Sequence, residues 1–500
     1  MSAISEAGAA LAATSADDCR RVRDVLSSAG YSEEGVVKTL GVDTLSRLGE
    51  KRLPVLLRRT SGGTPLETLI RLFILDHVVD ISAARAAMAP MTPEQWAELG
   101  LVEIAGSEVR AVLQLRCFQG LVLAFDFVRR GPRGLRGDYV MGVSPSSLVL
   151  AGMTVRRNNQ AALDLGTGCG IEAFLAARHS RRVVAVDCNP RAIAIAAFNA
   201  RLNQLDNVEC RQGDMFHAVA GESFDLIVSN PPFIISPDYR HMFLNSGAEG
   251  DEVCRKIVQQ APGFLTEGGY CILNANWEVV TGEDWRERLA GWFQGNGCDG
   301  LVLHHNTKEP AEYAVQWIET ESENPAEFQR TFDDWMNYYA ARRVCGIASG
   351  VIVMRRAAGR ANWFATNDAP PSVSVQSGDD VARLVEARTF LYSLRCPTDL
   401  LEARLKLAAN VRFEQVAEVV DGSWRPISGK LRRVGGLEYE GKIDGPGAAM
   451  LARCDGSRQL KDQLQELAAA INVDMDKLAA PALEIIRHLL EQGFLVLAGA

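Results

Sequence analysis

The middle of the chain alternates between two hydrophobic patterns. Short runs of aliphatic and β-branched residues recur between stretches whose apolar residues follow helical spacing. The runs are AALDLG, RRVVAVD, DLIVSN, GGYCIL, DGLVLHH and YAVQWI. Strands that alternate with helices at this spacing are typical of an α/β domain with a doubly wound, mostly parallel sheet. We therefore predict such a domain over residues 139–356.

Residues 1–138 follow a different pattern, in which amphipathic helices dominate. The segment DDCRRVRDVLSSAG has helical spacing and stops at Gly30, while Thr64 and Glu67 stand at the spacing of a helix capping box. Two short strands are expected around Ala105 and Gly106. Helices followed by a small hairpin predict a mostly helical N-terminal domain with winged-helix-like character.

The end of the chain predicts a linker and a third domain. Residues 357–380 are rich in Pro, Ser, Asn and Asp, a composition typical of a linker. Residues 381–500 have the pattern of a small α+β domain, in which three helices precede a strand-like FLVL. Two roles stay open for this accessory domain: recognition of a peptide or protein partner, and capping or dimerisation.

Composition and charge exclude several classes of function. The chain has 47% hydrophobic and 23% charged residues, as globular proteins do, and its net charge of −9 opposes non-specific nucleic-acid binding. No apolar run reaches the roughly 18 residues that a membrane span needs. The first basic residues follow the small apolar N-terminal stretch, which is the wrong order for a secretory signal. We therefore expect a cytoplasmic protein that enters no membrane.

Metal chemistry is not expected from the cysteines and histidines. The 11 cysteines include no CxxC pair, and the 7 histidines show no ligand spacing. Several cysteines lie inside apolar runs, where a reduced thiol behaves as a small hydrophobic side chain.

Candidate chemistry begins with a glycine-rich turn after the first strand of the predicted α/β domain. Glycines at three alternate positions let the backbone bend sharply and approach a ligand without interference from a Cβ atom. The turn is Asp164-Leu165-Gly166-Thr167-Gly168-Cys169-Gly170. Dinucleotide sites and plain turns also use this pattern, so the turn alone identifies no ligand.

Three further signals follow in order along the chain. Asp187 ends the next strand, 17 residues after Gly170, where a carboxylate can accept hydrogen bonds from both hydroxyls of a ribose. Asp214 and Met215 follow the strand VECRQ, where an acid can accept the exocyclic amine of an adenine and a methionine can pack on its ring. The strand FDLIVS then runs directly into Asn230-Pro231-Pro232-Phe233.

These four motifs, in this order, resemble those of the class I S-adenosylmethionine (SAM) methyltransferases from about Gly142 to Gly269. The Asn-Pro-Pro-aromatic element resembles that of members that methylate a nitrogen in an amide or conjugated amine. The stretch SGAEGDEVCRKIVQQAPGFLTEGGYCIL is similar to its counterpart in protein-glutamine methyltransferases that act on release factors. The resemblance implies a Rossmann-like fold, SAM as the cofactor and transfer of a methyl group to nitrogen.

The resemblance also implies a role for each motif residue. SAM would be held by Asp164, Gly166, Thr167, Gly168, Gly170, Asp187, Asp214, Met215 and Asn230, and the catalytic element would be Asn230, Pro231, Pro232 and Phe233. In the family, the asparagine side-chain oxygen and the next backbone carbonyl accept both N–H groups of the target, the prolines stiffen the loop, and the aromatic ring stacks on the target. Two readings stay open for Asp164, contact with SAM and orientation of SAM from behind the loop. The segment Gly142–Ser147 stands where the family has a segment that closes over SAM.

The substrate is the least determined part of the prediction. The sequence carries Phe233 where the release-factor enzymes usually carry tyrosine, and those enzymes have no counterpart of residues 381–500. We favour the amide nitrogen of a glutamine-like side chain in a protein or peptide. An RNA base amine is the alternative, since six arginines lie between Arg110 and Arg136, although an acidic run from Glu309 to Asp334 opposes it. A small-molecule acceptor and a non-catalytic SAM-binding protein remain as further alternatives.

Overall fold

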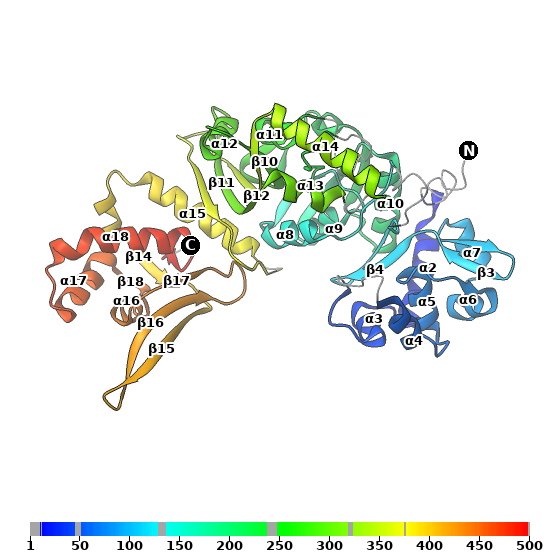
Figure 1. The fold of residues 1–500 in the computed structure, drawn as a ribbon, viewed down its shortest axis with the longest axis horizontal. Coiled ribbons are helices and arrows are strands. Elements are labelled where there is room, and N and C mark those ends of the chain that lie inside the picture. The colour runs from blue at the N-terminus through cyan, green and yellow to red at the C-terminus, as the bar shows by residue number, and fades with distance from the viewer. Residues whose placement is uncertain are drawn as a thin grey trace.

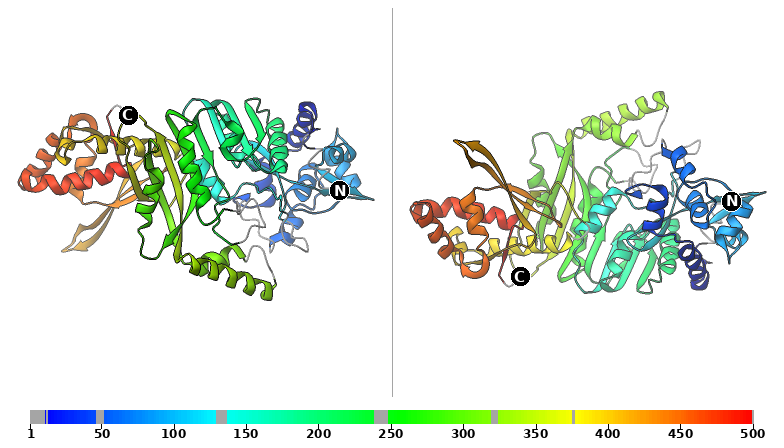
Figure 2. Two further views of the ribbon diagram at one scale, coloured as in Figure 1. Left: turned by 90° about the horizontal axis from the view of Figure 1, so that it is seen from above. Right: turned by 90° about the horizontal axis from the view of Figure 1, so that it is seen from below.

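Three blocks lie in a row along the molecule. The computed structural model describes residues 11, 13–45, 52–128, 137–237, 248–318, 324–374 and 377–498. The N-terminal block, the central block and the C-terminal block follow one another along the long axis (Figure 1), and the views from above and below place the central sheet between the two terminal blocks (Figure 2). None of the helices within these ranges has the length and apolar character that a bilayer crossing requires.

The N-terminal block combines helices with small antiparallel sheets. Its elements are α2 (Ala16–Ser28), α3 (Glu33–Leu40), α4 (Leu53–Arg59), α5 (Pro65–Phe73), β1 (Val79–Asp80), α6 (Ile81–Met88), α7 (Pro93–Glu98), β2 (Val102–Ala105), β3 (Glu108–Ala111), β4 (Gln114–Phe118) and β5 (Leu121–Phe125). The predicted capping box is confirmed, because Thr64 Oγ1 accepts the Glu67 N–H while the Glu67 carboxylate accepts the Thr64 N–H. The expected hairpin around Gly106 is β2–β3, which β1 extends to three strands in the order β1-β3-β2.

The central block is built on an eight-stranded sheet in the order β13-β11-β12-β10-β9-β6-β7-β8. Its elements are α8 (Pro145–Met153), β6 (Asn159–Leu165), α9 (Ile171–Ala177), β7 (Ser180–Asp187), α10 (Pro190–Leu202), β8 (Val208–Gln212), η3 (Met215–Val219), β9 (Phe224–Ser229), α11 (Glu252–Gln260), η4 (Ala261–Gly263), β10 (Leu265–Val280), α12 (Trp285–Phe293), β11 (Cys298–Lys308), α13 (Pro310–Ile318), α14 (Pro325–Ala341), β12 (Val344–Arg356) and β13 (Phe364–Asp368). Strands β6 to β10 pair in parallel, whereas β12 runs antiparallel to both β10 and β11. The predicted doubly wound, mostly parallel sheet is confirmed.

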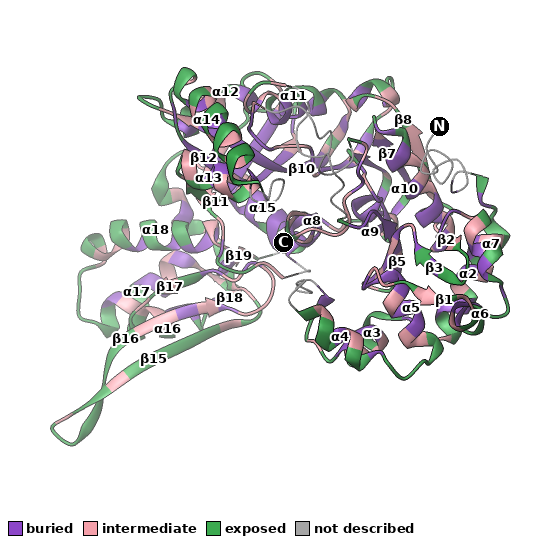
Figure 3. Ribbon diagram, turned by 45° about the vertical axis from the view of Figure 1, so that its right-hand side comes forward, coloured by how far each residue is buried: buried purple, intermediate pink, exposed green. Residues whose placement is uncertain are grey.

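Helices cover both faces of this sheet, as the alternation of side chains along each strand requires. Ala162 on β6 faces a cluster that contains Phe174 of α9 and Phe198 of α10. Its neighbour Leu163 faces the opposite cluster, which contains Ile257 of α11. Figure 3 shows the strands buried between the two helical layers. The carboxyl ends of β6, β7 and β9 are thereby held together at one edge of the sheet.

Two of the predicted elements are wrong. The run YAVQWI is not a strand but the end of helix α13, where buried Tyr313, Ala314 and Ile318 follow helical spacing and Pro310 stands at the first helical position. The expected linker, residues 357–380, contains β13, which pairs in parallel with β11 at the edge of the central sheet. The sheet therefore extends past the boundary that composition predicted.

The C-terminal block joins two small sheets to four helices within the residues described. Its elements are α15 (Gly378–Ser393), η5 (Pro397–Glu402), β14 (Arg404–Leu407), β15 (Val411–Val420), β16 (Ser423–Arg433), β17 (Glu440–Lys442), α16 (Gly445–Leu451), β18 (Asp455–Gln459), α17 (Leu460–Ala470), α18 (Met475–Glu491) and β19 (Leu495–Leu497). The three helices before a final strand, predicted from FLVL, are α16, α17 and α18 before β19. Strands β15 and β16 form a hairpin that projects from the block (Figure 1).

Helix α15 meets the central block at the carboxyl end of α8. A Cβ atom at Gly378, the first residue of α15, would lie 1.9 Å from the carbonyl oxygen of Thr154, which follows α8. A Cβ at Gly152 would lie 2.7 Å from the carbonyl oxygen of Ser374. Only glycine allows this close approach, so the C-terminal block is seated directly against α8.

Candidate active site

A cavity of about 790 Å³ opens at the carboxyl ends of β6, β7 and β9. Open α/β sheets bind ligands at this edge. The cavity is lined by most of the predicted site residues, namely Gly166, Thr167, Gly168, Asp187, Asp214, Met215, Asn230, Pro231, Pro232 and Phe233. The structure therefore brings together motifs that are spread over about 70 residues of sequence.

Asp164 and Gly170 are not among the residues that line the cavity, and they support the glycine turn from behind. Asp164 Oδ2 accepts the Thr167 hydroxyl at 2.6 Å and the Ala173 N–H at 3.0 Å. Gly166, Gly168 and Gly170 all have positive φ, and a Cβ at Gly170 would lie 2.2 Å from the ring of Phe174. Of the two readings of Asp164, its position favours orientation of the turn from behind. Its burial raises the pKa of this carboxyl to about 7.

Asp187 lies at the end of β7, where backbone N–H groups donate to both of its carboxylate oxygens. Its Oδ2 accepts the Gly168 N–H and its Oδ1 accepts the Asn189 N–H, both at 2.9 Å. Each carboxylate oxygen has a second lone pair, and the residue lines the cavity. Burial raises the pKa of Asp187 above its usual value. The backbone thus holds the side chain in place at the cavity wall.

Asp214 and Met215 lie at the rim of the cavity after β8. The Gly213 N–H donates to the Asp187 carbonyl at 3.0 Å, which ties this turn to the end of β7. The Asp214 side chain is 79% exposed, and its Oδ2 lies 3.9 Å from Nδ1 of the His217 ring. An exposed carboxylate at this edge is accessible to a group that enters from solvent.

Asn230 follows β9 and is surrounded by polar partners. Its Nδ2 donates to the Ser146 hydroxyl at 3.1 Å, and its Oδ1 accepts from Asn274 Nδ2 at 2.9 Å. Ser146 belongs to the first turn of α8, whose N-cap is Ser144. Pro231 is buried behind Asn230. The segment Gly142–Ser147, expected to lie near a ligand, does line the cavity.

Sequence reasoning missed two residues, Glu172 and Asn274, that line the cavity. Glu172 is in the first turn of α9 and is only 5% exposed, yet its Oε1 has no hydrogen-bond partner in the described chain. Burial and the nearby Asp164 raise its pKa well above the usual range. Both residues carried a signal, because Glu172 is the one charged residue in the apolar run IEAFLAA, and Asn274 is one of two asparagines in the otherwise apolar strand YCILNANW.

Charge divides the cavity into two halves. The three carboxylates on its described walls, Glu172, Asp187 and Asp214, all belong to the half formed by the glycine turn, β7 and β8. The other half extends beyond Asn230 over β10, β11 and α13, and its side chains include Asn276, Asn306, Lys308, Gln316 and Trp317. Among its described lining residues this second half has no carboxylate.

Helices α13 and α14 cover the loop that follows Phe233. The Tyr339 hydroxyl donates to the Ile235 carbonyl at 2.7 Å, and the Tyr313 hydroxyl accepts the Ile235 N–H at 3.3 Å. Asn276 Nδ2 donates to the same Tyr313 hydroxyl at 2.7 Å. Both backbone groups of Ile235 are therefore satisfied by tyrosines, which hold the loop in place.

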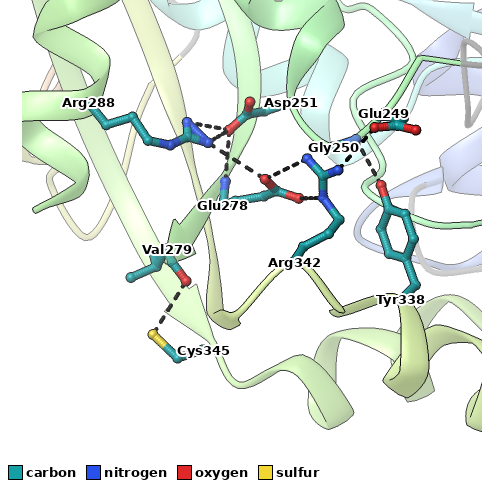
Figure 4. A network of polar contacts seen from close by, with 9 residues as sticks. All are labelled: Glu249, Gly250, Asp251, Glu278, Val279, Arg288, Tyr338, Arg342 and Cys345. Carbon is teal, nitrogen blue, oxygen red and sulfur yellow. Dashed lines mark hydrogen bonds and ion pairs between the residues drawn. The ribbon is translucent and has the colours of Figure 1, made fainter. Parts of the chain in front are cut away.

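A buried ionic network anchors α14 to the end of β10 (Figure 4). Arg342, just after α14, donates to both oxygens of Glu278, which is 4% exposed, at 2.6 and 3.0 Å. Asp251 pairs with Arg288 of α12, and the Gly250 N–H donates to the Tyr338 hydroxyl at 2.9 Å. Each buried charge has a partner of opposite sign, so the network fixes α14 beside the second half of the cavity.

The arginine stretch from Arg110 to Arg136 forms no continuous basic patch among the residues described. Arg110 is paired with Asp76 at 3.4 Å, and burial lowers the pKa of Arg116. Arg129, Arg130, Arg133 and Arg136 lie outside the described residues. Cys169 is buried, which raises the pKa of its thiol to about 12, as befits a loop residue and not a nucleophile.

Similar proteins decide the family. A family model described as the methyltransferase small domain matches residues 143–287. The release factor glutamine methyltransferase of Xylella fastidiosa (strain Temecula1) is 38% identical over 205 residues, which cover 36% of this chain and 72% of that protein. The chain belongs to the glutamine methyltransferase family. Membership implies SAM as the methyl donor and confirms the predicted resemblance to the class I SAM methyltransferases and their protein-glutamine members.

Other glutamine methyltransferases match shorter segments. The ribosomal protein uL3 glutamine methyltransferase of Bordetella pertussis is 36% identical over 132 residues, covering 24% of this chain and 44% of that protein. The chain spans only 46% of the release factor glutamine methyltransferase of X. fastidiosa strain 9a5c. Two models described as domains of unknown function match residues 28–112 and 384–497. A solved methyltransferase from Pyrococcus furiosus is similar at 16% identity and a TM-score of 0.29, covering 47% of this chain and 89% of that one.

The residues of the first half of the cavity fit the SAM expected of a glutamine methyltransferase. SAM has two cationic groups, its sulfonium and its ammonium. Glu172 offers a buried carboxyl group whose Oε1 has no partner within the described chain, and a nearby cation would favour its ionised form. Asp187 offers carboxylate oxygens at the cavity wall to the hydroxyls of a ribose. The glycine turn brings backbone to the cavity surface without Cβ atoms.

Proposed function

We propose that the chain transfers a methyl group from SAM to the side-chain amide nitrogen of a glutamine in a protein. The observation that carries this proposal is the position of Asn230. Its carboxamide stands between the half of the cavity that carries the carboxylates and the half that lacks them. Names of the relatives add support, because they specify glutamines of release factors and of ribosomal protein uL3.

In this proposal the chain holds SAM through its first half. The backbone of Gly166, Thr167 and Gly168 lies along the cofactor, Asp187 accepts the two ribose hydroxyls, and Asp214 accepts the adenine amine while Met215 packs on the ring. Asp164 and Gly170 keep the glycine turn in shape from behind. When bound, SAM supplies a methyl group on an electrophilic sulfonium, so no strong base is required before transfer.

The chain's own contribution to the reaction is then orientation of the acceptor. An amide nitrogen is a poor nucleophile because its lone pair is delocalised. Asn230 Oδ1, which accepts one N–H from Asn274, has a second lone pair for the target, and the Pro231 carbonyl accepts the other target N–H. Phe233 stacks on the flat amide, and the two prolines keep these acceptors preorganised. Both target hydrogens are held, so the nitrogen lone pair is turned toward the methyl group.

The charge of the acceptor half favours an amide over an amine. A lysine or another cationic acceptor would need a carboxylate partner when it is removed from water. The described lining of this half instead has carboxamides, Trp317 and Lys308. Carboxamides pair readily with a neutral amide and its flanking peptide backbone. We propose further that the protein acts in the cytoplasm, because the relatives are named for glutamines of release factors and of a ribosomal protein, which take part in translation.

Labelled SAM tests the proposed function. Purified protein is incubated with tritium-labelled SAM and lysate fractions, and the labelled products are treated with protease or RNase. We expect label in protein that protease releases, and N5-methylglutamine after enzymatic digestion to amino acids. Label lost to RNase, or found only in small molecules, would overturn the proposal. SAM binding with no transfer to any fraction would mean a non-catalytic SAM-binding protein.

A further inference from the structure

The carboxamide of Asn230 can take two orientations that have nearly the same shape but exchange the positions of its hydrogen-bond donor and acceptor. A 180° rotation about its terminal bond exchanges the oxygen, an acceptor, for the NH2 group, a donor. Only the orientation with the oxygen toward the acceptor half can receive an N–H of a target amide. Something in the chain must therefore select one orientation.

Asn274 makes the contacts that select it. This residue lies on β10, the strand beside β9, and is 6% exposed. Its Nδ2 donates one hydrogen to the Ser146 backbone carbonyl and the other to Asn230 Oδ1, both at 2.9 Å. Asn230 Nδ2 in turn donates to the Ser146 hydroxyl at 3.1 Å.

The Ser146 carbonyl sets the direction of this chain of hydrogen bonds. A backbone carbonyl only accepts, so Asn274 must turn its NH2 group toward it. The second hydrogen of that NH2 then requires an acceptor at Asn230, which is Oδ1. The Ser146 hydroxyl does not select an orientation of the Asn230 carboxamide, because a hydroxyl can both donate and accept. The polarity of Asn230 is thus determined two hydrogen bonds away, by a group that cannot rotate.

We propose that Asn274 is a positioning residue that fixes the polarity of the Asn230 carboxamide for methyl transfer. The idea rests on the proposed function for its kinetic consequences, although the hydrogen-bond chain itself does not. Asn274 touches neither donor nor acceptor in this role. It acts through Asn230, whose second oxygen lone pair stays free for the target.

Three variants test the role. In Asn274→Asp both side-chain oxygens accept, so the Asn230 NH2 group turns toward them and its oxygen turns away. We expect kcat to fall about 10²-fold with SAM Kd and acceptor KM within threefold of wild type. Asn274→Ala, which leaves Asn230 free to rotate, should lose about tenfold in kcat. Combined with Asn230→Ala, it should cost nothing beyond Asn230→Ala alone, because both act through one group.

A matched control separates this effect from general damage. Asn159→Asp makes the same change at a buried asparagine at the opposite end of β6, next to Ser180 and away from the cavity. It should lower Tm with kcat within twofold of wild type. Multiplicative losses in the double variant, or an unchanged kcat in Asn274→Asp, would overturn the proposal.

A measurement that needs no methyl-acceptor substrate distinguishes the positioning role of Asn274 from the proposed function. With 15N-labelled asparagine, the side-chain NH2 signals of Asn230 should shift in Asn274→Asp, because the acceptor of this NH2 group changes from the Ser146 hydroxyl to the introduced carboxylate. If wild type labels no glutamine but this shift is seen, the proposed function fails and the positioning role stands. If wild type labels glutamine and neither the shift nor the loss of kcat occurs, the positioning role fails alone.

Discussion

Replacing Asp187 by alanine should weaken SAM binding without abolishing the fold. The carboxylate accepts the Gly168 and Asn189 N–H groups at 2.9 Å. In the proposed complex it also accepts the two hydroxyls of the ribose. A hydrogen bond to a charged group contributes about 1.5–3 kcal/mol. Water can enter the space left by the substitution, so we take the lower bound for each bond, and the Kd for SAM should rise about 10²-fold.

Calorimetric titration with SAM measures this change, and Asp225→Ala is its matched control. Asp225 also accepts two backbone N–H groups, those of Gln160 at 2.7 Å and Ala161 at 3.2 Å, but at the amino end of β9. Both variants lose anchored backbone and should lose comparable Tm. Only Asp187→Ala should lose affinity for SAM, and Asp225→Ala should stay within twofold of wild type.

Two further outcomes would refute the reasoning about Asp187. The first is an unchanged SAM affinity in Asp187→Ala, within threefold of wild type. The second concerns an S-adenosylhomocysteine analogue without the 2′ and 3′ hydroxyls, which should bind wild type and variant equally well. If the variant still distinguished this analogue from the parent compound, the hydroxyls would be bound elsewhere. Because burial raises the pKa of Asp187, wild-type affinity should also fall as pH is lowered and the carboxylate becomes protonated.

Three other predictions address the reaction, the glycine turn and the ionic network. Asn230→Ala should keep SAM affinity near normal while single-turnover transfer falls about 10²–10³-fold, and equal transfer would contradict the assigned role. Asp164, with a pKa raised to about 7, holds its proton more tightly in the folded state than in the unfolded state. Its protonation therefore adds about 4 kcal/mol to the free energy of unfolding below pH 4, and this contribution is lost by pH 7. The Tm of wild type should fall over that pH range relative to the Tm of Asp164→Asn, and parallel pH profiles of Tm in calorimetry would contradict this prediction. Glu278→Gln and Arg342→Met should each lower the free energy of unfolding in urea by about 2–3 kcal/mol. The double variant should lose less than the sum of the two single losses, and additive losses would show that the two side chains are not coupled.

The central sheet and its ligand edge were predictable because strands and turns there follow local rules. Asp187 ends a short strand, Asp214 and Asn230 each come just after one, and parallel strands bring their carboxyl ends to one edge. The strand assigned to YAVQWI failed, since Tyr313, Ala314 and Ile318 fit a short apolar run as well as a helix face. The strand β13 was hidden by linker-like composition, because its pairing with β11 is a contact distant in sequence.

Several residues that line the cavity, and the whole of its acceptor half, were harder to predict from the sequence. Asn274 was visible as a polar residue in an apolar strand, but its partner Ser146 lies 128 residues away. Glu172 stands in an apolar run but also in the first turn of a helix, where acids are common, and its burial in the fold distinguishes it from an ordinary first-turn acid. The described lining of the acceptor half comes from β10, β11, β12 and α13, none of which carries a motif. Local pattern therefore indicated the cofactor, whereas the acceptor depends on packing.

Helix α8 connects two contacts that lie at its opposite ends. Its first turn carries the Ser146 carbonyl that determines the polarity of Asn230, and the Thr154 carbonyl after its last residue abuts Gly378 of the C-terminal block. Nine residues of helix form a stiff rod of about 13 Å between the two. The seat of the C-terminal block and the contact that orients Asn230 therefore lie at opposite ends of one short helix, so a shift of α8 along its axis would change both together.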